Sequence, residues 1–332
     1  MIRTLLISLA LLGPIPALAQ DVRSAPRPGS AVDGLEAPVF ARGLGDISDL
    51  ALGSDGTVFA ADARSGRIWT IRDRGLDGRA DSVQALPQRF DLPSGLAVGN
   101  DTLFVADRNG VWRMRGAGTP ELLAPLARAG ATDRPHPIAV MPDGSLRLGL
   151  SHPDGTSQLL RIDARTGEAE RLFSAPAPLS ALSKGPPGTP LLIVLAQAGN
   201  TGLGMAPDTV SEIEGEAVAA WADGAAGQVV LSGAQGVRLH DASLMGVAPT
   251  GTPLLSGLRS GAVLLDTRGI LVALPSDGTI RLVRPARPLP PPRPEPEAPA
   301  PDMQLDPEVL ILRGSGIERA SDIDSYRDVP DE

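Results

Sequence analysis

Histidine is the residue type best suited to acid–base chemistry near neutral pH, and this sequence contains three: His136, His152 and His240. His136 stands directly before an apolar run, from which it can face a cavity, whereas His152 lies in a turn and His240 ends a strand. No two of them have the spacing of metal ligands, such as i and i+4. Of the three, His136 is therefore the histidine best placed to face a cavity. The alternative for each histidine is a solvent-exposed or locally hydrogen-bonded side chain.

A short acidic segment, DRGLDGRAD at residues 73–81, places a carboxylate at every fourth position. Calcium binds through oxygen ligands of this kind, so Asp73, Asp77 and Asp81 are candidate metal ligands. The alternative is that each aspartate bonds its own backbone in a turn, as aspartates commonly do. The sequence has no cysteine, no Gly-x-Ser-x-Gly elbow and no phosphate-binding loop, which argues against disulfides, thiolate chemistry and serine hydrolases of that type.

Composition indicates a turn-rich globular protein. Of 332 residues, 42% are hydrophobic, which is enough to bury a large core. Glycine and proline are abundant, with 38 and 33 residues, and both favour turns over long helices. The net charge of −9 argues against a polyanion as the main partner, because phosphate binding relies on a basic face. We therefore expect no nucleic-acid partner.

A pattern of strands and turns repeats along the chain and must position any site. The stretch PSGLAVGNDTLFVADRNGVWRM, residues 93–114, has counterparts at residues 47–73 and 136–163, and fainter ones begin at Leu179, Val218 and Gly261. The first strands of the six units align at intervals of 39 to 47 residues, on Ser48, Gly95, Ile138, Ser180, Ala219 and Ala262.

The period and the alternation of apolar residues predict an all-β, six-bladed β-propeller with about four antiparallel strands per blade. Asp-Gly turns between alternating runs are typical of hairpins. Helical repeats would be broken by the frequent glycines, and a sandwich needs no equal spacing. Strand material from Ala37 to Leu44 is available to pair with the last blade and close the ring.

The ends of the chain differ from its middle. Residues 1–19 resemble a secretory signal peptide, with Arg3 before an apolar run and Ala-Leu-Ala at the cleavage point, which predicts a periplasmic or secreted protein without a membrane span. Residues 20–36 are the expected linker and residues 37–285 the propeller. A proline-rich acidic linker follows at 286–308 and an acidic, mostly disordered tail at 309–332. The alternative for Val309–Leu312 is docking on a sheet edge or a partner.

The stretches DGTVFAADARSGRIWTIRD, GLDGRADS and LPSGLAVGNDTLFVADRNGVWRM resemble the opening blades of the quinoprotein glucose/sorbosone dehydrogenase family. The resemblance is good over residues 47–114, fair to Asp163 and slight beyond. It implies pyrroloquinoline quinone, commonly with calcium, in a central cavity, and oxidation of a sugar hydroxyl or aldehyde. It further implies that His136 takes the substrate proton, and that Arg134 and Arg147 lie near the anionic quinone.

Three functions remain open on the sequence. The first is this sugar oxidoreductase, with a small-molecule sugar as substrate. The second is a non-catalytic propeller that binds a periplasmic protein or a sugar, with the tail as tether. The third is a hydrolase that resembles gluconolactonases, with a divalent metal bound by acidic residues along the central channel.

Overall fold

The computed structural model describes residues 31–126, 136–184, 191–197, 200–204, 210–214, 217–223, 228–243, 246–247, 251–257 and 259–286, with side chains outside 184–227 and 242–250. The chain divides into two units, Met1–Arg287 and Pro288–Glu332, and every described residue belongs to the first. These residues form strands and turns, and they include no helix long and apolar enough to cross a membrane.

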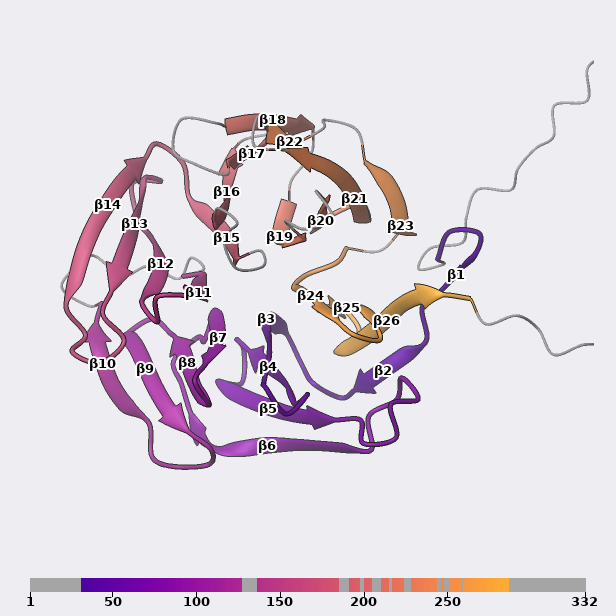
Figure 1. The fold of residues 1–332 in the computed structure, drawn as a ribbon, viewed down its shortest axis with the longest axis horizontal. Helices are drawn as coiled ribbons and strands as arrows, with labels where there is room; N and C mark the ends of the chain where they lie inside the picture. The colour runs from indigo at the N-terminus through magenta and orange to yellow at the C-terminus, as the bar shows by residue number, and fades with distance from the viewer. Residues whose placement is uncertain are drawn as a thin grey trace, which may run out of the picture. The chain divides into compact units, whose positions relative to one another are not determined.

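The described strands pair into six antiparallel sheets; five are each built from one repeat of the sequence, and the sixth also takes strands from before the first repeat (Figure 1). The first sheet contains β3 (Ile47–Leu52), β4 (Val58–Asp62), β5 (Arg67–Arg72) and β6 (Ser82–Arg89). The second contains β7 (Gly95–Gly99), β8 (Thr102–Ala106), β9 (Gly110–Arg115) and β10 (Glu121–Pro125), and the third β11 (Ile138–Val140), β12 (Leu146–Ser151), β13 (Ser157–Ile162) and β14 (Ala169–Ala175).

The remaining strands continue the same pattern. The fourth sheet contains β15 (Leu179–Lys184), β16 (Leu191–Gln197), β17 (Asn200–Gly204) and β18 (Val210–Glu214), and the fifth β19 (Ala217–Asp223), β20 (Gln228–Gly233), β21 (Gly236–Ser243), β22 (Gly246–Val247) and β23 (Thr252–Ser256). The sixth contains β24 (Val263–Asp266), β25 (Gly269–Leu274) and β26 (Thr279–Pro285), together with β1 (Leu35–Glu36) and β2 (Val39–Arg42). The prediction of an all-β propeller with antiparallel sheets of about four strands is thus confirmed.

Apolar clusters between neighbouring sheets hold the first unit together. One joins the first sheet to the second, including Ala61, Ile68 and Val105, and another joins the second to the third. Similar clusters join the third to the fourth, the fifth to the sixth, and the sixth to the first. A sheet with two apolar faces cannot cover both alone, so packing the sheets around a common centre buries them. The innermost strands, such as β3, β7 and β11, therefore face the centre (Figure 1).

The sixth sheet combines strands from both ends of the described chain. β2 pairs antiparallel with β26, as Val39 lies opposite Arg281, and β1 pairs with the same strand farther along. The prediction that residues 37–44 pair with the last blade is confirmed. An isolated bridge from Ala31 to Leu255 places part of the expected linker against the fifth sheet as well.

A buried cluster of charged side chains, which we call the latch, joins the first and sixth sheets. Asp73 follows β5, and Arg268 lies in the turn between β24 and β25. Arg268 Nη1 donates to Asp73 Oδ2 at 2.7 Å, and its Nη2 also contacts Asp266 Oδ2. The side chains of Arg268 and Asp73 are 8% and 0% exposed, so this ion pair is shielded from solvent. The Arg268 guanidinium also lies 4.9 Å from the centre of the Phe40 ring.

Candidate functional site

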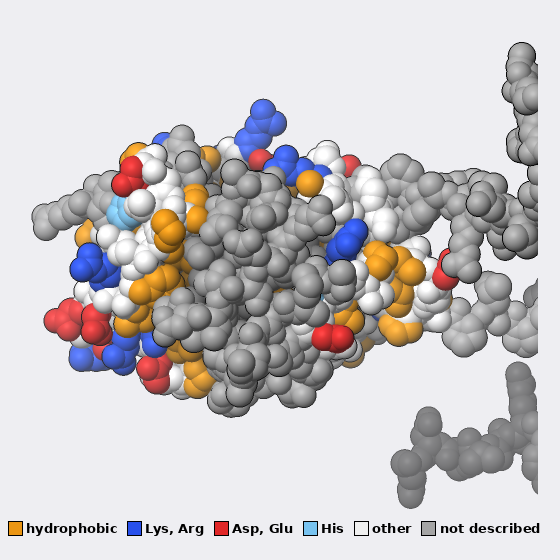
Figure 2. Space-filling model, turned by 90° about the horizontal axis from the view of Figure 1, so that it is seen from above, with side chains coloured by type: hydrophobic (Ala, Val, Ile, Leu, Met, Phe, Trp, Pro, Cys, Tyr) orange, Lys and Arg blue, Asp and Glu red, His pale blue; other side chains and the backbone are white. Residues whose placement is uncertain are grey.

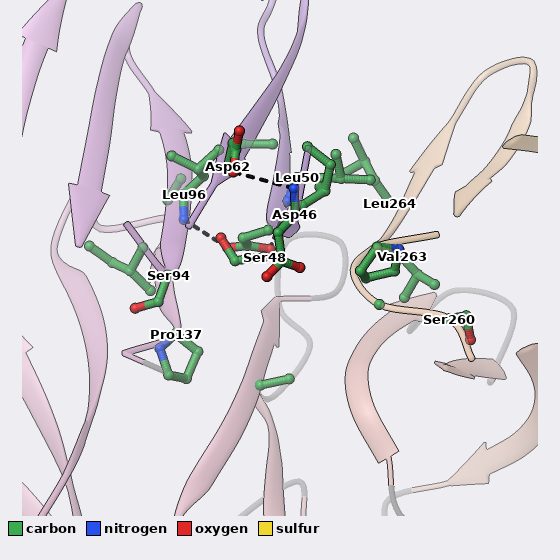
Figure 3. Close-up of a pocket in the computed structure, with 18 of the residues that line it drawn as sticks. Asp46, Ser48, Leu50, Asp62, Ser94, Leu96, Pro137, Ser260, Val263 and Leu264 are labelled. Atoms are coloured by element: carbon green, nitrogen blue, oxygen red, sulfur yellow. Dashed lines mark hydrogen bonds between the residues drawn. The ribbon is translucent and has the colours of Figure 1, made fainter. Parts of the chain in front are cut away.

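A central cavity of 1420 Å³ lies where the innermost strands of the sheets meet. Its lining comes from five of the six sheets, through residues of β3, β7, β11, β15 and β24 and the loops next to them. Figure 3 shows Ser48, Ser94 and Ser260 around this cavity, each from a different sheet. Because a cavity of this size accommodates a small ligand, it is the candidate functional site.

Hydroxyl groups surround one end of the cavity, near the start of the innermost strands. Ser48 and Ser180 lie at shifts in the pairing register of β3 and β15. Such bulges insert one extra residue into a strand and redirect its side chain. The alternation of apolar and polar residues does not reveal a bulge, so the repeat pattern predicts the strand but not the direction of these serines.

The hydroxyls also link one sheet to the next. Ser48 Oγ donates to the Pro93 carbonyl at 2.7 Å, and Ser94 Oγ accepts the His136 backbone N–H at 2.9 Å. Ser260 Oγ donates to the Gly236 carbonyl at 2.7 Å. These hydrogen bonds fix the serine side chains in place, and each hydroxyl oxygen can take part in more than one hydrogen bond.

Asp49 is the carboxyl group on the innermost strand of the first sheet, and it lines the cavity beside these serines. Its Oδ2 accepts the Leu96 N–H of the second sheet at 2.7 Å, and its Oδ1 accepts the Leu50 N–H at 2.8 Å. Burial raises the pKa of the Asp49 carboxyl to about 7, against the opposing effect of the two backbone donors. A carboxyl with this pKa exchanges a proton close to neutral pH.

The residues at the positions equivalent to Asp49 in the other described repeats are apolar. The equivalent positions in four other sheets hold Leu96, Ala139, Ala181 and Val263, and all four line the same cavity. Asp49 is thus one carboxyl in a ring of apolar side chains, which explains its desolvation. Sequence reasoning did not single out Asp49. The alignment of the repeats contains the relevant difference, since this position holds an acid only in the first unit.

Charged groups of the cavity are mainly acidic. Among the described lining residues, four are aspartates and two are arginines: Asp46, Asp49, Asp62 and Asp277, and Arg64 and Arg259. The Asp62 carboxylate is engaged in hydrogen bonds within the turn that follows it, since its Oδ1 accepts the Arg64 and Ser65 N–H groups at 3.1 Å. Asp46, Arg64, Arg259 and Asp277 are exposed. Asp49 is therefore the half-buried carboxyl that faces the cavity interior.

His136 does not line the cavity, although Pro137, its neighbour, does. Its side chain is buried, at 1% exposure for the residue, and among the described residues no group forms a well-aligned hydrogen bond with either ring nitrogen. Burial lowers the pKa of the His136 imidazole and outweighs the opposing effects of the Gly149 backbone and Asp107. Nearby His152 lowers this pKa further. The structure thus favours a neutral imidazole packed between sheets, and its role as a base stays a prediction.

Of the two predicted cofactor arginines, the structure describes Arg147, and it places this residue outside the cavity lining. Arg147 on β12 lies opposite Ala139 on β11, and its Nη1 donates to Ser145 Oγ at 2.7 Å in the adjoining turn. It is not among the lining residues. Burial lowers the pKa of Arg147, while Asp143 has the opposite effect. Arg134 lies outside the described residues.

Asp73, Asp77 and Asp81, the predicted metal ligands, share one loop, but their carboxylates are engaged with donors. Asp73 Oδ2 accepts the Gly78 N–H at 2.9 Å as well as Arg268. Asp77 Oδ1 accepts the Arg79 N–H at 2.8 Å, and Asp81 Oδ2 accepts the Arg74 N–H at 2.6 Å. The described residues contain no group of three histidine or acidic side chains placed to hold a metal ion, so this geometry lends the calcium prediction no support.

Charges of both signs occur on the described part of the outer surface. Figure 2 shows acidic and basic side chains next to each other on the described part of one face. Ion pairs at the surface include Arg161–Asp143, at 3.5 Å, and Arg113–Glu121, at 2.8 Å.

Solved structures share the fold of this chain at low sequence identity. A Trichoderma reesei structure of Carbohydrate-Active Enzymes Family AA12 matches with a TM-score of 0.63 and 11% identity, covering 78% of this chain and 98% of that one. A gluconolactonase from Xanthomonas campestris matches at 0.53 and 14%, covering 78% and 97%. Regucalcin, a calcium-binding protein from Agrobacterium tumefaciens, matches at 0.53 and 17%, covering 76% and 92%.

No protein-family model and no curated protein matches the sequence. These three structural matches are below 25% identity, so what they establish is the propeller fold, which this chain shares with sugar-related enzymes and a calcium-binding protein.

Proposed function

We propose that this protein binds a small polyhydroxylated molecule of the sugar class in the central cavity. The observation that carries the proposal is the combination of serine hydroxyls at one end of the cavity with an apolar ring just inside it. Sugars present hydroxyl groups at their edges and C–H groups on their faces, which fit these two kinds of surface. Fold neighbours named for carbohydrate-active and gluconolactonase proteins point to the same ligand class.

The test is a panel of aldoses, sugar acids and sugar lactones, measured by thermal shift and isothermal titration calorimetry. A bound sugar raises the melting temperature in a concentration-dependent manner. An Ala181→Phe variant, which fills the cavity from β15, is expected to abolish this shift, whereas Ala117→Phe on an exposed turn retains it. Failure of every member of the panel to bind the unaltered protein would overturn the proposal.

A second candidate is hydrolysis of a sugar lactone in the same cavity, and the pKa of Asp49 favours it. A base is most effective when its pKa lies near the working pH. Ionised Asp49 would take a proton from water as the water oxygen bonds to the lactone carbonyl carbon. The ring C–O bond then breaks, and the leaving oxygen takes up the proton to give the open-chain acid. Lactone hydrolysis by the unaltered protein, lost in Asp49→Asn, is the expected result, with and without added calcium, zinc or manganese.

Oxidation through pyrroloquinoline quinone is less well supported by the described cavity. The carboxylates of that cofactor require basic side chains around them, whereas the described lining contains four aspartates and two exposed arginines. His136 and Arg147 lie outside the lining. Absence of a thermal shift at micromolar quinone with calcium would exclude this reading, and dye reduction on addition of an aldose would restore it.

The cellular setting is part of the proposal. The signal-like residues 1–19 support export to the periplasm, where the sugar or a periplasmic protein would be met. Residues 286–332 hold five arginines and eleven acidic residues and are suited to serve as an acidic tether for such a partner. Fractionation of cells, followed by mass determination of the amino terminus, tests the export; recovery of a partner that depends on residues 286–332 tests the tether.

We also infer that each of the six sheets is one blade of a single ring. Six sequence repeats, six paired sheets and the apolar clusters between neighbours support this count. A crystal structure with a different number of blades would contradict it.

A further inference from the structure

We propose that the ligand of the central cavity carries a protonated amine, as an amino sugar does, and that this amine pairs with Asp49. The inference rests on the proposed sugar-binding function and specifies the ligand class. It starts from one contrast in the cavity: a carboxyl group faces the interior, and no described cationic side chain forms an ion pair with it.

The carboxyl group is held rigidly and has capacity left for a ligand. Oδ1 and Oδ2 each accept one backbone N–H, from Leu50 and from Leu96 on the neighbouring sheet. A carboxylate offers about four acceptor positions, so two bonds leave room for a further donor. Its orientation is fixed by two strands, and a ligand therefore meets a preorganised acceptor.

The environment favours a cation over a neutral or anionic group. The ring positions equivalent to Asp49 are apolar, at Leu96, Ala139, Ala181 and Val263, so an ionised carboxylate here is poorly solvated. An ammonium group that reaches it replaces the lost hydration with a charge-assisted hydrogen bond. The excess of aspartates over arginines in the described lining also favours a cationic ligand.

The rest of the ligand must suit the serines. With an amine at Asp49, the hydroxyls of the same small molecule lie within the space lined by Ser48, Ser94 and Ser260 (Figure 3). Ser94 Oγ accepts one N–H, so its own proton is available to a ligand oxygen, and the Ser48 oxygen can accept from a ligand hydroxyl. An amine and several hydroxyls on one small scaffold describe an amino sugar or amino alditol.

The experiment compares matched ligands that differ in one group. Glucosamine is paired with glucose and N-acetylglucosamine, and 1-amino-1-deoxyglucitol with glucitol, each titrated into the full chain at pH 7.5. The amine-bearing member of each pair is expected to bind about tenfold or more tightly, and acetylation to remove the gain. Asp49→Asn is expected to remove the preference, whereas Asp241→Asn, at an exposed position outside the cavity lining, keeps it.

A proton readout separates an ion pair from a merely structural effect of Asp49. Because the amine selects the ionised carboxylate, binding is expected to release protons from Asp49 below pH 7 and to tighten as the pH rises from 5 to 7. Calorimetry in buffers of different ionisation enthalpy measures this release. Equal binding of amino and neutral sugars would overturn the amine inference and leave the sugar-binding proposal intact, whereas no binding by any sugar would overturn both.

Discussion

Arg268 of the sixth sheet donates a 2.7 Å hydrogen bond to Asp73 of the first sheet, across 195 residues of sequence. The contact joins the first sheet to the last and lies beside the strand pairing of β2 with β26, which closes the same sheet. Arg284 adds to it, since its Nη1 donates to the Asp77 carbonyl at 3.1 Å. The acidic loop of residues 73–81 is therefore a contact between the two ends of the ring.

Removal of the buried cation is expected to weaken this contact strongly. Arg268→Met leaves Asp73 and Asp266 without their shared partner in a site where the side chains of Asp73 and Arg268 are 0% and 8% exposed. Breaking a buried ion pair costs about 3 kcal/mol or more of unfolding free energy. Urea denaturation measures the loss. Arg161→Met, which breaks an exposed pair with Asp143, is the control, with an expected effect below about 1 kcal/mol. Equal small losses in the two variants would show that the latch does not hold the ring.

Asp49→Asn is expected to change how stability depends on pH. The pKa of Asp49 is about 7 in the folded chain and 3.8 as a free side chain, so the folded state holds more protons between these values. Asp49 therefore lowers the stability progressively as the pH rises from about 4 to about 7. The variant lacks this loss, and its stability relative to the unaltered protein should be higher at pH 8 than at pH 4.5. Denaturant titrations at both pH values measure the difference, and an unchanged difference would contradict the assignment.

His136 acts in the opposite direction. Burial lowers the pKa of His136 below 6.5. On acidification the imidazole is therefore protonated at a higher pH in the unfolded chain than in the folded chain. Stability is then lost as the pH falls from about 6.5 toward the folded pKa. His136→Gln should reduce this acid sensitivity between pH 6.5 and 5. Thr119→Ala, at an exposed loop position without a titratable group, is the control and should keep it. Melting temperatures across this range provide the measurement.

Gly95→Ala is expected to force the second and third sheets apart. A Cβ at Gly95 would lie 2.3 Å from the His136 carbonyl oxygen and 3.1 Å from Ile138 Cγ2. Such overpacking costs about 1–3 kcal/mol. Gly75→Ala, where a Cβ meets no atom within 4 Å, should leave the midpoint of urea unfolding nearly unchanged. A similar midpoint for both variants would show that the packing between β7 and β11 accommodates the added methyl group.

The repeats made the fold readable because each sheet is encoded locally. Alternating strands and Asp-Gly turns specify one hairpin after another, and the equal spacing specifies how the sheets stack. The closure by residues 37–44 was predictable for the same reason, since a strand without a partner in its own repeat was left over. The site was less predictable, because a cavity is built from single positions of several repeats.

Particular residues show where local reasoning stops. The carboxylates of residues 73–81 have an oxygen-ligand pattern, and sequence spacing cannot reveal that Asp73 meets Arg268 from the other end of the chain. His136 precedes a strand as expected, yet its ring is packed away from the cavity. Asp49 was overlooked because a single acid in an apolar strand carries no motif, and its meaning comes from the neighbours that other repeats supply.

The pairing of β2 with β26 gives the ring a seam, because the first and last strands of the described chain share one sheet. Proteolytic trimming up to residue 43 would open that seam and expose the side of β26 that β2 covers. A circularly permuted gene that joins the two ends and starts at the Asn100–Asp101 hairpin would keep every sheet intact. If the permuted protein keeps its unfolding stability and the trimmed protein loses it, the stability of the ring depends on its closure and not on the position of the chain termini.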